Sequence, residues 1–187
     1  TGEELKQIIA KMSKSLKNVV NPEDVTQRYG ADSLRLYEMF MGPLDVMKPW
    51  DDRNVKGVFN FLARTYRFFS NHENIFEGKE DVEILKGLHK TIRKVEEDIE
   101  NLKFNTAISE MMIFLNLVYR KGKVSRETAN SFVLILSPFA PHLGEELWHL
   151  LGHDMTLAYE PWPGVIEEYL KTDVFEYPVS FNGKMRF

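Results

Sequence analysis

Residues 85–102 have the sequence LKGLHKTIRKVEEDIENL, and the spacing of its apolar residues decides the fold class. These residues follow one another in alternating steps of three and four: Leu85, Leu88, Ile92, Val95, Ile99 and Leu102. This period is typical of a helix that buries one side, and it persists for about three heptads. The stretch predicts either the inner seam of a helical bundle or a coiled coil between chains. Apolar helical patterns on both sides of it favour the bundle.

Helix signals continue outward in both directions. Four residues are suited to cap helices, namely Asn21, Asp32, Asn105 and Ser125. A further helix, from about residue 52 to 71, has apolar residues at a helical period: Val55, Val58, Phe59, Leu62, Tyr66 and Phe69. Gly30, Pro138, Pro141 and Gly152 stop helices. The sequence therefore predicts a mainly α protein, an antiparallel helical bundle with short connections.

The pattern changes toward the C-terminus. Residues 160–164 (EPWPG) are typical of a loop, and residues 175–181 resemble a strand. Asn182-Gly183 favours a tight hairpin turn, with a return strand beginning at Lys184. A lone hairpin is marginally stable, so we expect a further α/β domain starting near Val174. We predict three parts. Residues 1–50 contain a polar loop and connecting helices, residues 51–153 form the bundle, and residues 154–187 are a linker and the start of a truncated domain.

Composition limits the class of protein. The chain has 187 residues, of which 43% are hydrophobic and 28% charged, with a formal net charge of −4. This charge argues mildly against a generic nucleic-acid binder. Cysteine is absent, which excludes disulfides and cysteine-ligated metals and suits the cytoplasm. No apolar run reaches membrane-spanning length, and the Thr1-Gly2 start suggests a segment of a longer protein.

The strongest functional signal is Lys11-Met12-Ser13-Lys14-Ser15. No acidic residue follows until Glu23, so the segment combines positive charge with hydroxyl donors. Lysine is a mobile point charge suited to phosphate. From composition alone, a solvated loop explains such a segment equally well.

The order of these residues resembles the class I aminoacyl-tRNA synthetases. Residues 11–15 are identical to the second signature motif of that family, and residues 18–22 (NVVNP) and 29–35 (YGADSLR) follow at the family spacing. Residues 36–44 (LYEMFMGPL) resemble the leucine-specific branch. Residues 137–142 (SPFAPH) and 145–148 (EELW) resemble the end of the anticodon-binding bundle. Residues 181–186 (FNGKMR) resemble the start of a C-terminal domain, so the likeness covers nearly the whole chain.

The resemblance implies an ATP-dependent, monomeric ligase that charges tRNA(Leu) with leucine through leucyl-adenylate, using Mg²⁺. Lys11 and Lys14 would be its catalytic residues, stabilising negative charge on the departing pyrophosphate. Ser13 and Ser15 would complete the ATP-binding loop. The nucleotide-binding fold and a His-rich motif are absent from the chain, so we expect this segment alone to be inactive. A valyl-, isoleucyl- or methionyl-type synthetase and a non-enzymatic helical scaffold are the alternatives.

One position departs from the family pattern. The family commonly has glycine where Lys17 stands, and glycine permits a positive φ that lysine adopts at a cost. Either the loop is shaped differently here, or the position tolerates a side chain. Lys17 would then supply a further phosphate contact.

Basic and aromatic residues outside this loop are candidates for contact with tRNA, whose backbone attracts positive charge. With Lys17, they are Trp50, Arg53, Lys56, Arg64, Arg67, Arg120, Lys121 and Lys123. Solvated helix faces are the alternative, and for Trp50 a packing role beside Pro49. His142, Glu146, His149 and His153 have a spacing found in metal sites, but Gly152 should end the helix before His153. We therefore expect capping and surface roles there and no metal.

Overall fold

The computed structural model describes residues 10–171, 180–181 and 184–185. The helices within these ranges are α1 (Pro22–Tyr29), α2 (Ala31–Phe40), α3 (Asp52–Phe69), α4 (Val82–Glu100), α5 (Phe104–Lys121), α6 (Arg126–Leu136) and α7 (Pro141–Leu150). Short 3-10 helices lie at η1 (His72–Asn74), η2 (Leu157–Tyr159) and η3 (Glu167–Leu170). The predicted mainly α bundle is confirmed, and none of the described helices is long and apolar enough to cross a membrane.

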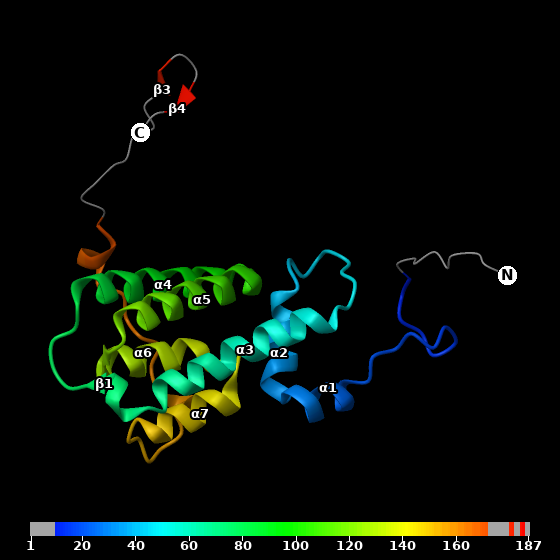
Figure 1. Ribbon diagram of the computed structural model, residues 1–187, viewed down its shortest axis with the longest axis horizontal. Helices are drawn as coiled ribbons and strands as arrows, with labels where there is room; N and C mark the ends of the chain where they lie inside the picture. The colour runs from blue at the N-terminus through cyan, green and yellow to red at the C-terminus, as the bar shows by residue number, and fades with distance from the viewer. Residues whose placement is uncertain (1–9, 172–179, 182–183, 186–187) are drawn as a thin grey trace.

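The bundle is centred on α4 and α5, which lie side by side above α3, α6 and α7 (Figure 1). A three-residue connection, residues 101–103, reverses the chain between α4 and α5, so the two helices are antiparallel. The core between the layers includes fully buried aromatic rings from three helices: Phe69 stacks on Phe132, which also contacts Phe114. Helices α1 and α2 cover one end of α3 and connect the bundle to the loop at residues 11–18 (Figure 1).

The buried side of α4 differs from the predicted seam. Ile84, Leu88, Ile92 and Val95 are buried, whereas Leu85 is half-buried and Leu102 is 58% exposed. An α-helix repeats every 3.6 residues, so over this length the core stripe drifts away from a strict seven-residue repeat. The seam is therefore correct at its centre and wrong at its ends.

Leu102 lies outside α4 because it helps to end the helix. Its φ is 55°, the left-handed conformation usually taken by glycine. The Lys103 amide donates to the Asp98 carbonyl at 2.7 Å and the Leu102 amide to the Ile99 carbonyl at 3.1 Å. These two bonds form a Schellman motif, which satisfies the last carbonyls of α4.

Two of the four predicted caps are confirmed. The Asn21 side chain accepts from the Glu23 amide, and the Ser125 side chain accepts from the Thr128 amide. The prediction for Asn105 is wrong, because α5 begins at Phe104 and Asn105 lies within its first turn. Asp32 is likewise inside α2 and does not cap it.

Asp32 instead caps α7, which lies far away in sequence. Its Oδ2 accepts from the Leu143 amide at 2.8 Å, and its Oδ1 accepts from the His142 amide at 3.4 Å. His142 Nδ1 lies 2.8 Å from the same Oδ1. The Asp32 carboxylate is buried and accepts hydrogen bonds from amides at the start of α7 that have no partner within that helix. It therefore links α2 to α7.

The buried side of α3 also differs from the prediction. Phe59 and Tyr66 belong to the apolar stripe identified in the sequence, but they are 38% and 44% exposed. Phe61 and Phe68 are buried in their place. Helix α3 packs against helices on several sides, so its core stripe is wide and its position is set by tertiary packing.

Two short pairs of strands complete the described structure. β1 (Ile75–Phe76) pairs in parallel with β2 (Val124–Ser125), a contact that the sequence did not reveal. β3 (Ser180–Phe181) and β4 (Lys184–Met185) pair antiparallel, which confirms part of the predicted hairpin. Its Asn182-Gly183 turn and residues 172–179 lie outside the described residues.

Residues 157–170 pack on the bundle. Leu157 is buried, and Trp162 and Val165 pack against the core. His89, on α4, accepts a hydrogen bond at Nδ1 from the Ile166 amide at 3.2 Å and stacks on Tyr169. Much of the acidic segment after residue 154 therefore packs on α4 and α7. The domain boundary predicted at residue 154 remains a prediction.

Candidate functional site

The loop at residues 11–18 is held in shape by one amide side chain. Asn18 Oδ1 accepts from the Ser13 amide at 2.8 Å, and Asn18 Nδ2 donates to the Lys11 carbonyl at 3.3 Å. Residues 14–17 form a turn closed by the Lys17 amide, which donates to the Lys14 carbonyl at 3.2 Å. Asn18 therefore holds the segment that carries Lys11 and Ser13 against the end of the turn.

The two serines of the loop brace it from inside. The Ser13 hydroxyl lies 3.2 Å from the Ser15 hydroxyl and accepts from the Leu16 amide at 3.2 Å. Lys11 and Lys14 are both exposed, and within the described part of the chain their side chains have no bonded partner. The loop thus places two unpaired positive charges on a hydrogen-bonded turn, an arrangement suited to a polyphosphate.

Lys17 has a φ of 53°, in the left-handed region. Of the two alternatives for this position, the structure has the second: the loop keeps the backbone that glycine favours, and lysine is accommodated with an exposed side chain. Such a conformation costs a non-glycine residue roughly 1–2 kcal/mol.

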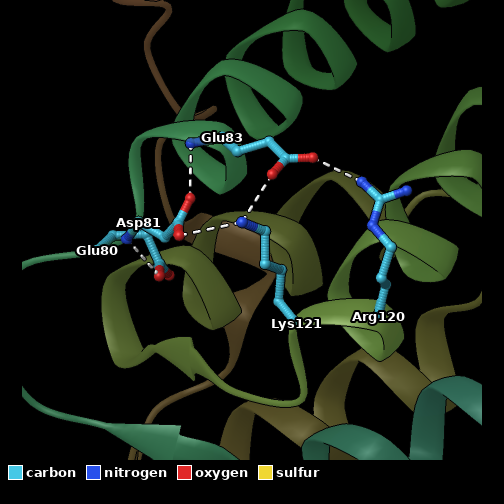
Figure 2. Close-up of polar contacts among 5 residues, drawn as sticks. All are labelled: Glu80, Asp81, Glu83, Arg120 and Lys121. Atoms are coloured by element: carbon cyan, nitrogen blue, oxygen red, sulfur yellow. Dashed lines mark hydrogen bonds and ion pairs between the residues drawn. The ribbon is translucent and has the colours of Figure 1, made fainter.

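Two of the candidate RNA-binding residues are neutralised by acids (Figure 2). Lys121 Nζ lies 2.6 Å from Glu83 Oε2 and 3.1 Å from Asp81 Oδ2, and Arg120 Nη2 lies 2.6 Å from Glu83 Oε1. The hydrogen bonds from Lys121 hold the pKa values of Asp81 and Glu83 below their usual range, and raise that of Lys121. These acids already neutralise the positive charge of Lys121 and Arg120, so the turn after α5 attracts a polyanion only weakly.

Figure 2 also shows why this acidic corner is ordered. Asp81 caps α4 by accepting from the Glu83 amide at 2.7 Å. The buried Glu80 accepts from the Asp81 amide at 2.9 Å and from the Ser125 amide at 2.6 Å. The corner thus joins the start of α4 to β2 and positions the acids that hold Lys121.

Three more candidates are engaged in local contacts. Arg53 forms an ion pair with Asp51 at 2.8 Å while staying 89% exposed. Arg64 donates to Asn116 at 2.8 Å and lies over the Tyr119 ring. Trp50 donates to Asp52 at 2.7 Å and meets the buried Tyr37 edge-on, so it packs as an anchor at the start of α3. The Tyr37 hydroxyl accepts from the Asp51 amide, and burial raises its pKa.

Lys56, Arg67 and Lys123 are exposed, and their side chains have no bonded partner among the residues that the structure describes. Lys56 and Arg67 share one side of α3, where no acidic residue occurs between Arg53 and Ser70. Among the described candidates, the outer side of α3 is therefore a helix surface whose lysine and arginine are not paired with acids.

The histidine and glutamate residues near α7 serve separate local contacts. His142 is bound to Asp32, and His153 stacks on Trp148 and lies 3.1 Å from Asn130 Oδ1. The Glu145 carboxylate accepts a hydrogen bond from the Leu157 amide. Across residues 10–171, no three potential ligands among His, Cys, Asp and Glu gather as a metal site would require.

Sequence reasoning missed the role of Asn18 in the loop and the role of Asp32 as a cap of α7. Asn18 could have been found from its position, because an amide just after a turn often binds the backbone of that turn. The local signal at Asp32 pointed to the wrong helix, and its true partners lie 110 and 111 residues away.

Comparison with known proteins shows to which family the chain is similar. Residues 8–45 match the model for class I tRNA synthetases (I, L, M and V), and residues 81–187 match the model for the anticodon-binding domain of tRNA ligase. The chain is 51% identical over 180 residues to the leucine–tRNA ligase of Leptospira biflexa serovar Patoc, covering 94% of this chain and 21% of that protein. It is 47% identical to the leucine–tRNA ligase of Amoebophilus asiaticus, with 95% and 20% covered.

A solved structure is similar throughout the fold. The crystal structure of the ternary complex of Agrobacterium radiobacter K84 agnB2 LeuRS with tRNA and LeuAMS matches with a TM-score of 0.80 and 36% identity, over 94% of this chain and 25% of that chain. The chain spans about a fifth to a quarter of the length of these relatives. By its bundle and by the match over residues 81–187, the chain belongs to the anticodon-binding domain family of class I tRNA ligases.

Proposed function

We propose that this chain is part of a leucine–tRNA ligase, in which it supplies the loop that handles the phosphates of ATP and a helical surface for tRNA(Leu). The observation that carries the proposal is the loop at residues 11–18, an acid-free turn with two exposed lysines whose side chains have no bonded partner among the described residues. The relatives named above are leucine–tRNA ligases, which supports leucine as the substrate in this proposal.

The chemistry follows from charge. When the leucine carboxylate attacks the α-phosphate of ATP, negative charge grows on the departing pyrophosphate. Lys11 and Lys14 stabilise this charge, and Ser13 and Ser15 hold the turn between them and offer hydroxyl donors. Because Asn18 and the serines fix the turn in advance, little reorganisation is needed when the charge forms.

ATP enters such a reaction with Mg²⁺, which would neutralise part of the phosphate charge. Residues 10–22 contain no carboxylate, so this part of the chain offers cations and hydroxyls to the phosphates. The lysines and serines of the loop therefore suit the phosphates of ATP directly. In this proposal the enzyme is monomeric and acts in the cytoplasm.

For tRNA, the surface that best suits a polyanion is the outer side of α3 with Lys56 and Arg67, together with Lys17 and Lys123. Arg120 and Lys121 rank lower because Glu83 and Asp81 neutralise them. Arg53, Arg64 and Trp50 are held by neighbours and contribute to the shape of this end of the bundle.

The proposal is tested with the full-length protein by amino-acid-dependent exchange of pyrophosphate into ATP. We expect exchange with leucine to exceed exchange with valine, isoleucine and methionine by at least about 100-fold in kcat/KM, a ratio comparable to known discrimination between such side chains. A preference for one of the other three amino acids would assign the chain to another branch of the family. No exchange with any of them would reject the enzymatic proposal.

A further inference from the structure

A shallow apolar pocket lies where α3 meets the α1–α2 junction and the start of α7. Its volume is about 410 Å³, within the range of roughly 300–1,000 Å³ typical of small-ligand pockets. Aromatic rings line it, from Tyr29, Phe59 and Tyr66, with Ala63 and His142 beside them. Phe59 and Tyr66 are 38% and 44% exposed, although both belong to a helix with a well-packed inner side.

Basic charge lies next to the pocket. Along α3, Phe59, Ala63 and Tyr66 share a side with Lys56 and Arg67, at helical steps of three and four residues. The aromatic rings and the two cations therefore form one continuous surface of α3. A polyanion with flat apolar groups complements this surface, since its phosphates and its rings meet different residues.

The polar end of the pocket suits a neutral group. Asp32 occupies the first amides of α7, so this helix start offers no free amides to a phosphate, and the carboxylate repels one. A carboxylate only accepts, so His142 Nδ1 donates to it; when the ring carries a single proton, Nε2 is an acceptor. The His142 side chain is 75% exposed, and within residues 10–171 its Nε2 has no partner.

We propose that this pocket binds one unpaired base of the RNA, stacked on Tyr66 and Phe59, while Lys56 and Arg67 contact the adjoining phosphates. The proposal rests on the proposed function, because it takes tRNA as the partner. It adds that the bundle holds RNA by an unstacked nucleotide as well as by charge. An acceptor at His142 Nε2 suits a base with an exocyclic amino group.

The test measures the affinity of the full-length protein for tRNA(Leu) as a function of salt. Tyr66→Ala and Phe59→Ala should each weaken binding about 5- to 150-fold, the usual effect of losing a stacking ring. The slope of log affinity against log salt should stay unchanged, because phosphate contacts remain. Tyr66→Phe should restore binding, and Tyr159→Ala, at a ring that is 91% exposed and outside the pocket, should have no effect.

Two further arms separate the outcomes. Lys56→Ala and Arg67→Ala should each weaken binding and reduce the salt slope by about one. A fully paired RNA duplex should bind Tyr66→Ala and the unchanged protein equally well, because it offers no free base. If the lysine and arginine variants weaken binding while the aromatic variants do not, the base pocket is rejected and tRNA binding by α3 survives. If none of the four changes affinity, both proposals fail for this surface.

A cross-linking experiment does not depend on the folding of variants. Ultraviolet irradiation of the unchanged protein with tRNA(Leu) should attach a nucleotide to Phe59, Tyr66 or His142, located by mass spectrometry. Cross-links found only at other residues would overturn the proposal.

Discussion

At the scale of single residues, Lys17 shows how the loop tolerates a departure from its family pattern. Lysine stands with φ at 53°, where glycine would be free of strain. We expect Lys17→Gly to form leucyl-adenylate about tenfold faster than Lys17→Val. Both variants lose the amine, but a β-branched residue resists this conformation by a further 1–2 kcal/mol or so.

The measurement is pyrophosphate exchange at saturating leucine over a range of ATP concentrations. A valine variant as fast as the glycine variant would show that the enzyme does not use this backbone. A glycine variant far slower than the unchanged protein would assign the effect to the lost amine, as a phosphate contact.

Asp32 is the residue whose loss should most damage the junction of α2 and α7. Asp32→Ala removes the acceptor of two α7 amides and of His142, so we expect the free energy of unfolding to fall by about 2 kcal/mol. Urea unfolding followed by circular dichroism measures this change. Asp154→Ala is the matched control, at an exposed residue with no side-chain contact among those described. Equal loss in both variants would contradict the capping role.

At the scale of elements, Leu102 ends α4 in a conformation that disfavours it. We expect Leu102→Gly to raise the free energy of unfolding by about 0.5–1 kcal/mol, because glycine adopts the left-handed C′ position of a Schellman motif at little cost. The leucine side chain is 58% exposed, so little burial is lost.

The control is Val82→Gly, at an exposed apolar residue in the first turn of α4. There glycine should destabilise the chain by about 0.5–1 kcal/mol, as it does within helices. Thermal or urea unfolding compares the two. If both substitutions destabilise the chain, the end of α4 does not depend on the left-handed residue.

The elements also show how far the sequence predicts the fold. Periodicity and local capping found the helices, with Asn21 and Ser125 at their correct starts, because these signals act over a few residues. The sequence could not show which side of α3 is buried, since Phe59 and Tyr66 fit a helical stripe as well as Phe61 and Phe68 do. Partners from other helices make that choice. The Asp32 cap, the β1–β2 pair and the neutralisation of Lys121 depend on distant contacts in the same way.

For the candidate site, a contiguous motif was enough to locate Lys11 to Ser15. The role of Asn18 needed coordinates, because its two hydrogen bonds reach five and seven residues back along a turn. The basic candidates could be named from sequence, but sorting them required their partners. Outside the loop, Lys56, Arg67 and Lys123 have no charged partner in the part of the chain that the structure describes, whereas Arg120 and Lys121 are paired.

At the scale of the whole molecule, His89 joins the acidic segment after α7 to α4. Burial lowers its pKa, and its neutral Nδ1 accepts from the Ile166 amide. The unfolded chain therefore takes up a proton at this residue first as pH falls, so stability is full above about pH 6.5 and declines below it. Unfolding at pH 7.5, 6.5 and 5.5 should show this decline, and it should be smaller in His89→Gln. Identical pH profiles would exclude His89 as a source.

The central claim for the molecule is that the loop at residues 11–15 handles the phosphates of ATP. The most direct test is the rate of leucyl-adenylate formation by Lys14→Ala in the full-length protein, measured by pyrophosphate exchange beside equilibrium binding of leucine. We predict that the rate falls by about 100-fold or more, as when a preorganised charge-stabilising group is lost, while the leucine dissociation constant changes less than about threefold. An unchanged rate of adenylate formation would contradict the claim.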